Sequence, residues 1–284
     1  MKTGIIGLGA MGQGMARRVA SAGYLTAVYN RTTSKAQDLA TELTVTAYDQ
    51  PEDLAAQVDL VLICVSADQD VLEMILAISK TLKPGSIVVD MSTVSSDTAK
   101  KAAAILAKKQ VGFLDAPVSG GVEGAKNGTL SIMVGGDADI LAKVRFVLET
   151  MSARITHIGA TGTGQATKAV NQIMGAGINQ AVTEALAFAQ AQQLPQEKVV
   201  EVISAGASGN WFLQHRGLTM TKGTFNPGFK VALHHKDLLI CQAMAEQVNI
   251  PIPVCATTIA DYAKLMAEGY GDDDISALFR LKRP

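Results

Sequence analysis

The stretch GIIGLGAMGQGM, Gly4 to Met15, decides the fold of the N-terminal half. It opens with a short apolar run typical of a buried parallel strand and ends in residues of helical composition. Gly7, Gly9 and Gly12 stand between the two with GxGxxG spacing. Such glycines allow a tight turn, close approach of a pyrophosphate, and close packing of helix on strand. The residues expected to hold a dinucleotide at this helix N-terminus are Gly7, Leu8, Gly9, Ala10, Met11 and Gly12.

A second apolar segment, YLTAVYNRT from Tyr24 to Thr32, falls where the next strand of such a unit belongs. NAD-selective folds place a carboxylate at the end of this strand, where it binds the ribose hydroxyls. This chain has Asn30, Arg31 and Thr32 instead. Arg31 can stack on adenine or bind a 2′-phosphate, and its two neighbours offer neutral hydrogen bonds. The alternative is a solvated turn before a helix cap. With the glycine turn, the pattern favours NADP, and NAD is the second choice.

Composition narrows the class of protein. The chain has 284 residues, 48% of them hydrophobic, and a net charge of −1, which argues against nucleic acid or an anionic membrane as partner. Its apolar runs fall short of the ~20 residues that span a bilayer. The three cysteines, Cys64, Cys241 and Cys255, are far apart. With no signal peptide before the first strand, we expect a reduced, cytoplasmic protein without a metal.

Short β-branched runs alternate with helix-length connections as far as residue 159. The runs are Val58 to Val65, Gly85 to Ser92, Val111 to Val118, Thr129 to Gly136 and Ala153 to Gly159. This alternation predicts the α/β class, with a Rossmann-type, doubly wound, largely parallel sheet.

The pattern then changes, because Gln165 to Gln193 reads as one helix of ~29 residues, about 43 Å long, and mostly helical sequence follows. We expect an NADP(H)-binding domain at residues 1–161. An all-α C-terminal domain for substrate binding and oligomerisation is expected at 162–284. So long an apolar helix predicts a homo-oligomer, a dimer or a tetramer.

Three further motifs carry a resemblance. They are DAPVSGGVEGAKNGTLSIMVGG (Asp115 to Gly136), GTGQATKAVNQ (Gly162 to Gln172) and FKVALHHKDL (Phe229 to Leu238). Together with the glycine turn they resemble the β-hydroxyacid dehydrogenases, essentially from end to end. The resemblance implies hydride transfer between a nicotinamide cofactor and a small carboxylate substrate, a β-hydroxy acid or its semialdehyde. It leaves open 3-hydroxyisobutyrate, tartronate semialdehyde, glyoxylate and succinic semialdehyde.

Hydride transfer to a carbonyl needs a proton donor, and Lys168 matches the family's catalytic lysine. Its surroundings are nearly uncharged in sequence, so burial would lower its pKa from about 10.4 towards neutrality. The alternative is a surface lysine on a helix. Asn171 and Gln172 follow one helical turn later and are both candidates for substrate binding. One of these amides can hydrogen-bond the lysine or a substrate hydroxyl and hold the geometry of proton transfer, which is a catalytic role. The family often has Asn at the later position, and we favour Asn171 because its shorter side chain needs less ordering.

The resemblance also implies contacts outside this helix. Ser119, Gly120 and Gly121 follow a strand end, where ligands bind. The Ser119 hydroxyl can donate to the substrate carboxylate or, as a catalytic residue, to its carbonyl, and the glycine N–H groups can bind a carboxylate, although a plain turn uses the same residues. Trp211 is expected either at the substrate pocket or as a core anchor.

The remaining cofactor contacts are expected in two places. Val65 and Thr93 lie at strand ends, with Thr93 beside the nicotinamide and Ser95 or Ser96 capping the next helix. Lys236 is expected to reach the cofactor. The neighbouring His234 and His235 point about 100° apart on a helix and lack carboxylate companions, so a structural or exposed role is favoured over metal binding.

Two readings from other classes stay open. A non-enzymatic cofactor-binding interaction protein on the same fold would be expected to lack the proton donor, yet Lys168 is present. An NAD-preferring 3-hydroxyisobutyrate dehydrogenase is the alternative within the enzyme class. Imine reductases depart in the catalytic motif, and decarboxylating 6-phosphogluconate-type enzymes usually have a longer helical domain.

Overall fold

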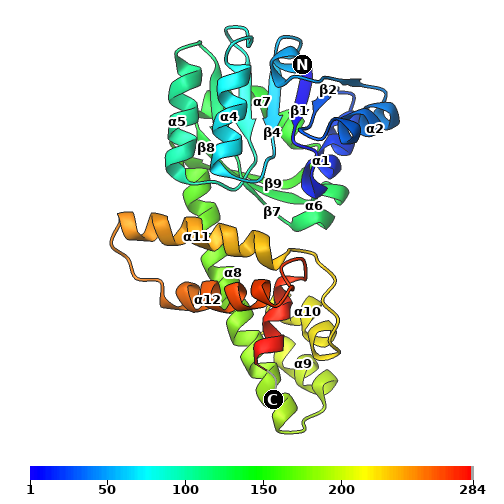
Figure 1. The fold of residues 1–284 in the computed structure, drawn as a ribbon, viewed down its shortest axis with the longest axis vertical. Coiled ribbons are helices and arrows are strands. Elements are labelled where there is room, and N and C mark those ends of the chain that lie inside the picture. Colours follow the sequence, from blue (N-terminus) through cyan, green and yellow to red (C-terminus); the bar gives the residue numbers. More distant parts are fainter. Residues whose placement is uncertain (283–284) are drawn as a thin grey trace. The chain divides into compact units, whose positions relative to one another are not determined.

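The computed structural model describes residues 1–282, which form two compact units. The first unit runs from Met1 to Lys168 and the second begins at Ala169. The division falls inside the long helix α8 (Thr163–Ala191) (Figure 1). The domain boundary expected at residues 161 and 162 stays a prediction.

The strands of the first unit form one sheet in the order β3-β2-β1-β4-β5-β6-β8-β7, with β9 paired to β8. Their bounds are β1 (Thr3–Ile6), β2 (Leu25–Tyr29), β3 (Thr46–Ala47), β4 (Leu60–Ile63), β5 (Ile87–Asp90), β6 (Gly112–Asp115), β7 (Val118–Ser119), β8 (Leu130–Gly136) and β9 (Ser152–Gly159). The strands from β3 to β6 pair in parallel, as β8 and β9 do, whereas β8 is antiparallel to both β6 and β7. The predicted doubly wound, largely parallel sheet is confirmed.

Helices cover both faces of this sheet. Those of the first unit are α1 (Ala10–Ser21), α2 (Thr33–Leu43), α3 (Pro51–Ala55), α4 (Asp68–Ile78), α5 (Ser96–Ala107), α6 (Gly121–Asn127) and α7 (Ala138–Leu148). Strand residues alternate between two cores, since Leu60 and Leu62 pack with α1, α2 and α7, while Val61 and Ile63 pack with α3, α4 and α5. Burial on both faces explains why these strands are continuous apolar runs.

Strands β1 and β4 lie side by side. From β1 the chain adds strands β2 and β3 on one side, and from β4 it adds β5 and β6 on the other, so the strand order reverses between β1 and β4. In an open α/β sheet, ligands bind at the carboxyl ends of the strands beside such a switch point. The glycine turn follows β1 and Val65 follows β4, so the topology places both at this edge.

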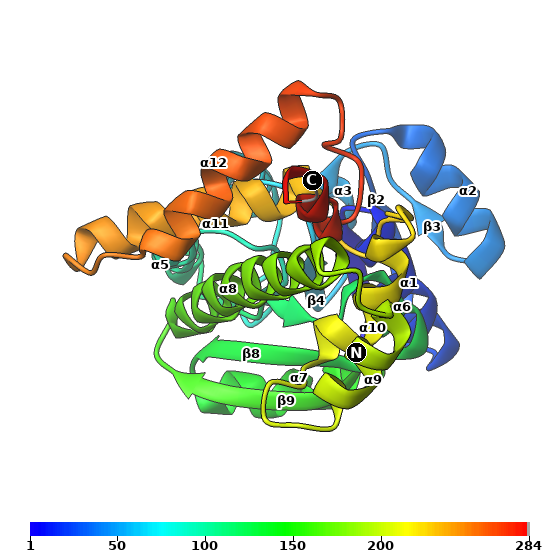
Figure 2. The ribbon, with the colours of Figure 1, turned by 90° about the horizontal axis from the view of Figure 1, so that it is seen from below.

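The second unit is helical, as predicted. It contains most of α8, then α9 (Gln196–Ser204), α10 (Trp211–Thr221), α11 (Val231–Gln247), α12 (Pro253–Ala267) and the 3₁₀ helix η1 (Ile275–Leu281). Helices α11 and α12 run alongside each other (Figure 2). Tyr262 and Phe279 are fully buried in its core. Helix α8 has 29 residues, which confirms the predicted long helix. Across the described part of the chain, the helices are too short or too polar to cross a membrane.

Candidate active site

The three glycines of the turn after β1 differ in what a side chain at each position would contact. Gly7 has φ +95°, and a Cβ there would overlap the carbonyl of Cys64. A Cβ on Gly12 would overlap the carbonyl of Gly7, whereas one on Gly9 would meet no protein atom within 4 Å. Gly7 and Gly12 therefore keep the turn closed, and Gly9 leaves open space beside the backbone.

Helix α1 begins at this open space. Its N-cap is Gly9, which has no side chain to accept from the first-turn N–H groups. These donors, on Ala10, Met11 and Gly12, together with the positive end of the helix dipole, suit an anion. The turn therefore fits the diphosphate of a dinucleotide.

The end of β2 is tied to the same turn. Asn30 accepts a hydrogen bond from Leu8 N (2.9 Å) through Oδ1, and its Nδ2 donates to Thr32 O (3.1 Å). The Asn30 amide thus joins the glycine turn after β1 to the loop after β2. The sequence predicted only a hydrogen bond from Asn30 to the cofactor.

Arg31, the next residue, projects into solvent. Its side chain is 87% exposed, and Nη1 lies 3.3 Å from Asp70 Oδ1. So exposed an ion pair contributes at most about 1 kcal/mol, so the guanidinium can exchange Asp70 for a phosphate. The first turn of α2, which starts after Thr32, carries no acidic residue.

The loops after β4 and β5 are joined by hydrogen bonds. Val65 N donates to Ser92 Oγ (2.9 Å), and Ser92 N donates to Asp90 Oδ1 (3.0 Å). Thr93 follows and is half-buried. Ser95 caps α5 by accepting from Thr98 N (3.1 Å), so of the two candidate caps Ser95 is the one used.

The structure brings Lys168 to the end of β7. Lys168 is 8% exposed, and its Nζ donates to Val118 O (2.9 Å), the residue before Ser119. The surface-lysine alternative is therefore excluded. After Ser119 the backbone enters the left-handed region at Gly120 (φ +128°) and Gly121 (φ +62°), conformations that glycine adopts without strain.

Two buried side chains fasten the start of α8, and sequence reasoning did not single them out as site residues. Asp115 accepts from Gly162 N (2.7 Å) and Gln165 N (2.9 Å). Gln165 accepts from Val94 N (3.1 Å) and donates to Ser92 O (2.8 Å). Burial raises the pKa of Asp115 against these hydrogen bonds. The segment that carries Lys168 is thus fixed to the ends of β5 and β6.

The second unit holds the other site residues of α8. Gln172 is 3% exposed, and its amide bonds both Asn171 and Asp237. Lys236 pairs with Asp237 (2.8 Å). His234 is buried, with Nδ1 3.0 Å from the Tyr262 hydroxyl. This contact supports the structural role expected for that histidine.

Trp211 lies at the start of α10 and is 61% exposed, so the core-anchor alternative is wrong. Its ring stacks on His215 with centroids 4.2 Å apart. Arg216 lies over the indole and is paired with the buried Asp274 (3.3 Å). That pairing neutralises the charge of Arg216.

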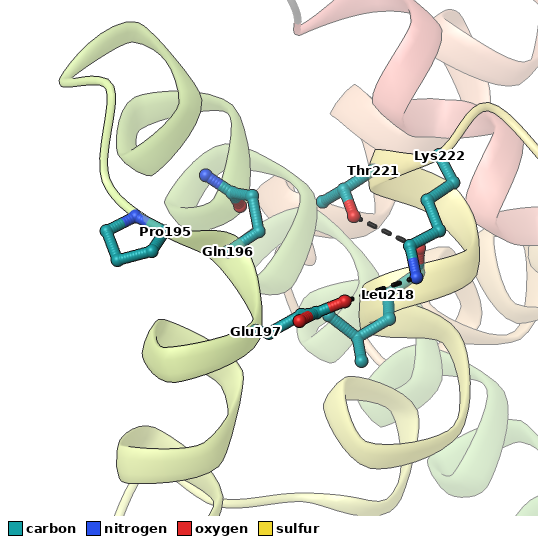
Figure 3. Close-up of a pocket in the computed structure, with 6 residues that line it drawn as sticks. All are labelled: Pro195, Gln196, Glu197, Leu218, Thr221 and Lys222. Carbon is teal, nitrogen blue, oxygen red and sulfur yellow. Dashed lines mark hydrogen bonds and ion pairs between the residues drawn. The ribbon is translucent and has the colours of Figure 1, made fainter.

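A hollow of about 320 Å³ lies elsewhere in the second unit, between α9 and α10 (Figure 3). Glu197 and Lys222 form an ion pair across it (3.4 Å). None of the predicted site residues lines this hollow. In the part of the chain that the structure describes, no three His, Cys, Asp or Glu side chains group as a metal site.

Known proteins match both halves of the chain. A family model for the NAD-binding domain of 6-phosphogluconate dehydrogenase matches residues 2–159. A second model, NAD-binding of NADP-dependent 3-hydroxyisobutyrate dehydrogenase, matches residues 162–282.

Individual relatives match over the whole length. An uncharacterised oxidoreductase of Shewanella frigidimarina is 38% identical over 99% of this chain and 98% of its own. The 2-hydroxy-3-oxopropionate reductase of Escherichia coli is 36% identical over 98% of this chain and 96% of its own. The structure of Mycobacterium tuberculosis 3-hydroxyisobutyrate dehydrogenase with L-serine has a TM-score of 0.91 and 29% identity, covering 100% of this chain and 99% of that one.

Proposed function

This chain belongs to the β-hydroxyacid dehydrogenase family and is an NAD(P)-dependent oxidoreductase of CH–OH groups, and we propose that it works with NADP(H) and a small semialdehyde. The substrate is a three- or four-carbon carboxylate of the type named for its relatives, 2-hydroxy-3-oxopropionate (tartronate semialdehyde) or the aldehyde of 3-hydroxyisobutyrate.

One observation carries the chemical part of this proposal. Lys168 is buried, and its Nζ is held by Val118 O next to Ser119. The nicotinamide supplies or takes the hydride when it is bound. Lys168 gives a proton to the carbonyl oxygen in reduction and removes it from the hydroxyl in oxidation. Ser119 and the N–H groups of Gly120 and Gly121 bind the substrate carboxylate, and Asn171 binds a polar group of the substrate.

The preference for NADP(H) rests on Arg31. Its guanidinium is exposed, and the first turn of α2 beside it carries no acidic residue. A 2′-phosphate therefore meets a cation and not the carboxylate that selects NAD. Thr93 and Lys236 are proposed to contact the nicotinamide half of the cofactor.

The test measures initial rates of NADPH and NADH oxidation with glyoxylate, succinic semialdehyde, tartronate semialdehyde and methylmalonate semialdehyde. Wild type is expected to reduce at least one of them, faster with NADPH. Lys168→Ala is expected to lose about 10²-fold or more of this rate. Lys143→Ala, a change at an exposed lysine of α7, is the control.

Two results would contradict the proposal. Binding of NADPH without reduction of any aldehyde would support a cofactor-binding protein. A rate that favours NADH would support the NAD-preferring alternative.

A further inference from the structure

Four polar side chains of the second unit form a continuous hydrogen-bonded chain between α8 and α11. Asn171 Nδ2 donates to Gln172 Oε1 (2.8 Å), and Gln172 Nε2 donates to Asp237 Oδ2 (2.7 Å). The other carboxylate oxygen, Asp237 Oδ1, lies 2.8 Å from Lys236 Nζ. Gln172 and Asp237 are 3% and 4% exposed, so solvent does not replace these partners.

The carboxylate fixes the direction of every bond in this chain. An ionised carboxylate only accepts hydrogen bonds, so Gln172 must turn its NH₂ group towards Asp237. Its carbonyl oxygen then faces Asn171, so Asn171 must donate a hydrogen bond from its own NH₂ group. Asn171 Oδ1 is thereby turned away from the chain as an acceptor at its end.

Gln172 itself is unsuited to touch substrate. Both of its polar atoms are bonded inside the unit, and it is buried. Asn171 is half-buried and ends the chain. An asparagine at position 172 would be one methylene shorter than the side chain that bridges Asn171 and Asp237 here.

We propose that Gln172 and Asp237 are positioning residues that hold Asn171 Oδ1 outward, as the acceptor that selects substrates with a hydroxyl on the α-carbon. The inference rests on the proposed function, in which Asn171 binds substrate. A methyl group is close to a hydroxyl in size but donates no hydrogen bond, and it would leave this oxygen unsatisfied. The site then prefers tartronate semialdehyde, which carries the hydroxyl, to methylmalonate semialdehyde, which carries the methyl.

Asp237→Asn is expected to reverse the chain with little change in shape. Lys236 retains the oxygen of the substituted side chain as its partner, so the new NH₂ group faces Gln172. Gln172 then turns its oxygen towards position 237 and its NH₂ group towards Asn171, which draws Oδ1 inward. The ratio of kcat/KM for the two aldehydes is expected to fall about tenfold, the value of a hydrogen bond left unmade.

A second substitution, at position 172, is expected to restore the direction of these hydrogen bonds. In the double variant Gln172→Glu with Asp237→Asn, the carboxylate at position 172 accepts from both neighbouring amides. Asn171 again donates its NH₂ group inward and exposes Oδ1. The ratio is expected to return to within about threefold of wild type, whereas any effect of the lost Lys236 ion pair persists in both variants.

The protein contains a second buried amide–carboxylate bond, which provides a matched control. Gln180 Nε2 donates to Asp261 Oδ2 (3.0 Å), between α8 and α12. Asp261→Asn changes a pair of the same two groups, with its glutamine on the same helix α8 as Gln172 but away from Asn171. It is expected to leave the ratio of the two aldehydes unchanged.

The experiment measures kcat/KM for tartronate semialdehyde and methylmalonate semialdehyde, with NADPH, in wild type and these three variants. The expected result is a hydroxyl preference in wild type that Asp237→Asn loses and the double variant regains. The inference is overturned if wild type prefers the methyl-bearing aldehyde, if Asp261→Asn has the same effect, or if the double variant stays like Asp237→Asn. Wild type that reduces neither these nor the other aldehydes would instead overturn the proposed function.

Discussion

Asp90→Asn is expected to make the protein more stable at neutral pH and to remove part of its pH dependence. Asp90 ends β5 and is fully buried. Oδ1 accepts from Ser92 N, while Oδ2 has no partner among the described residues. Burial raises the pKa of Asp90 to about 7, against the hydrogen bonds from Ser92 that lower it, and the carboxylates of Asp115 and Asp68 raise it further.

The direction in which the free energy of unfolding changes with pH depends on which pKa of Asp90 is higher, that of the folded or that of the unfolded chain. The unfolded chain releases the proton near 3.8, whereas the folded chain keeps it until about 7. Between these values the folded state binds more protons, so the free energy of unfolding falls as pH rises. Below the lower value both states are protonated, and above the upper value both are ionised, so the slope is confined to this window. The difference of about three pKa units corresponds to about 4 kcal/mol.

The measurement is urea denaturation of wild type and Asp90→Asn between pH 4 and 8.5. Asparagine cannot ionise and its oxygen can still accept from Ser92 N. The variant's advantage in free energy of unfolding should therefore grow from pH 4 and level off above pH 7, by about 4 kcal/mol in total. Asp38→Asn, at an exposed position of α2, is the control. A difference that is flat, or that falls as pH rises, would refute the reasoning.

The other predictions concern the cofactor turn and the start of α8. Arg31→Ala should weaken NADPH binding about tenfold or more and leave NADH binding unchanged, as fluorescence titration would show; equal losses would count against phosphate contact. Gly9→Ala should lower cofactor affinity with an unchanged Tm, because the new methyl meets no protein atom within 4 Å. Gly7→Ala should lower the stability itself, by about 1–3 kcal/mol from backbone strain alone; a Tm equal to that of Gly9→Ala would contradict this. Asp115→Ala strands the N–H groups of Gly162 and Gln165 and should cost about 2–6 kcal/mol in chemical denaturation, and a loss below about 1 kcal/mol would argue against its capping role.

The parts of the fold that follow local sequence rules were predictable. The glycine turn, the apolar strands and the 29-residue helix α8 depend on spacing and periodicity within short stretches. The antiparallel pairing of β7 with β8 was not predicted, because a strand of two residues, Val118 and Ser119, has no period to detect.

Candidate site residues could be predicted from sequence only where the residue type and its local motif indicate the role. Lys168 was proposed because it matches the family's catalytic lysine, and Arg31 because the residues beside it in sequence at the end of the second strand are not acidic. Asp115 and Gln165 escaped notice because their partners lie far along the chain, as with Gln165 and Val94, 71 residues apart. Asn30 is predicted to contact the cofactor, and its further bonds to Leu8 and Thr32 are visible only in the folded loops.

The central claim, that Lys168 moves the proton, is tested most directly by chemical rescue. The measurement is kcat of Lys168→Ala with saturating NADPH, with and without an added primary amine. We expect kcat to fall about 10²- to 10⁴-fold, to rise again with amine concentration, and the Kd of NADPH to stay unchanged. Turnover by the variant within a few-fold of wild type, with no response to amine, would contradict the account.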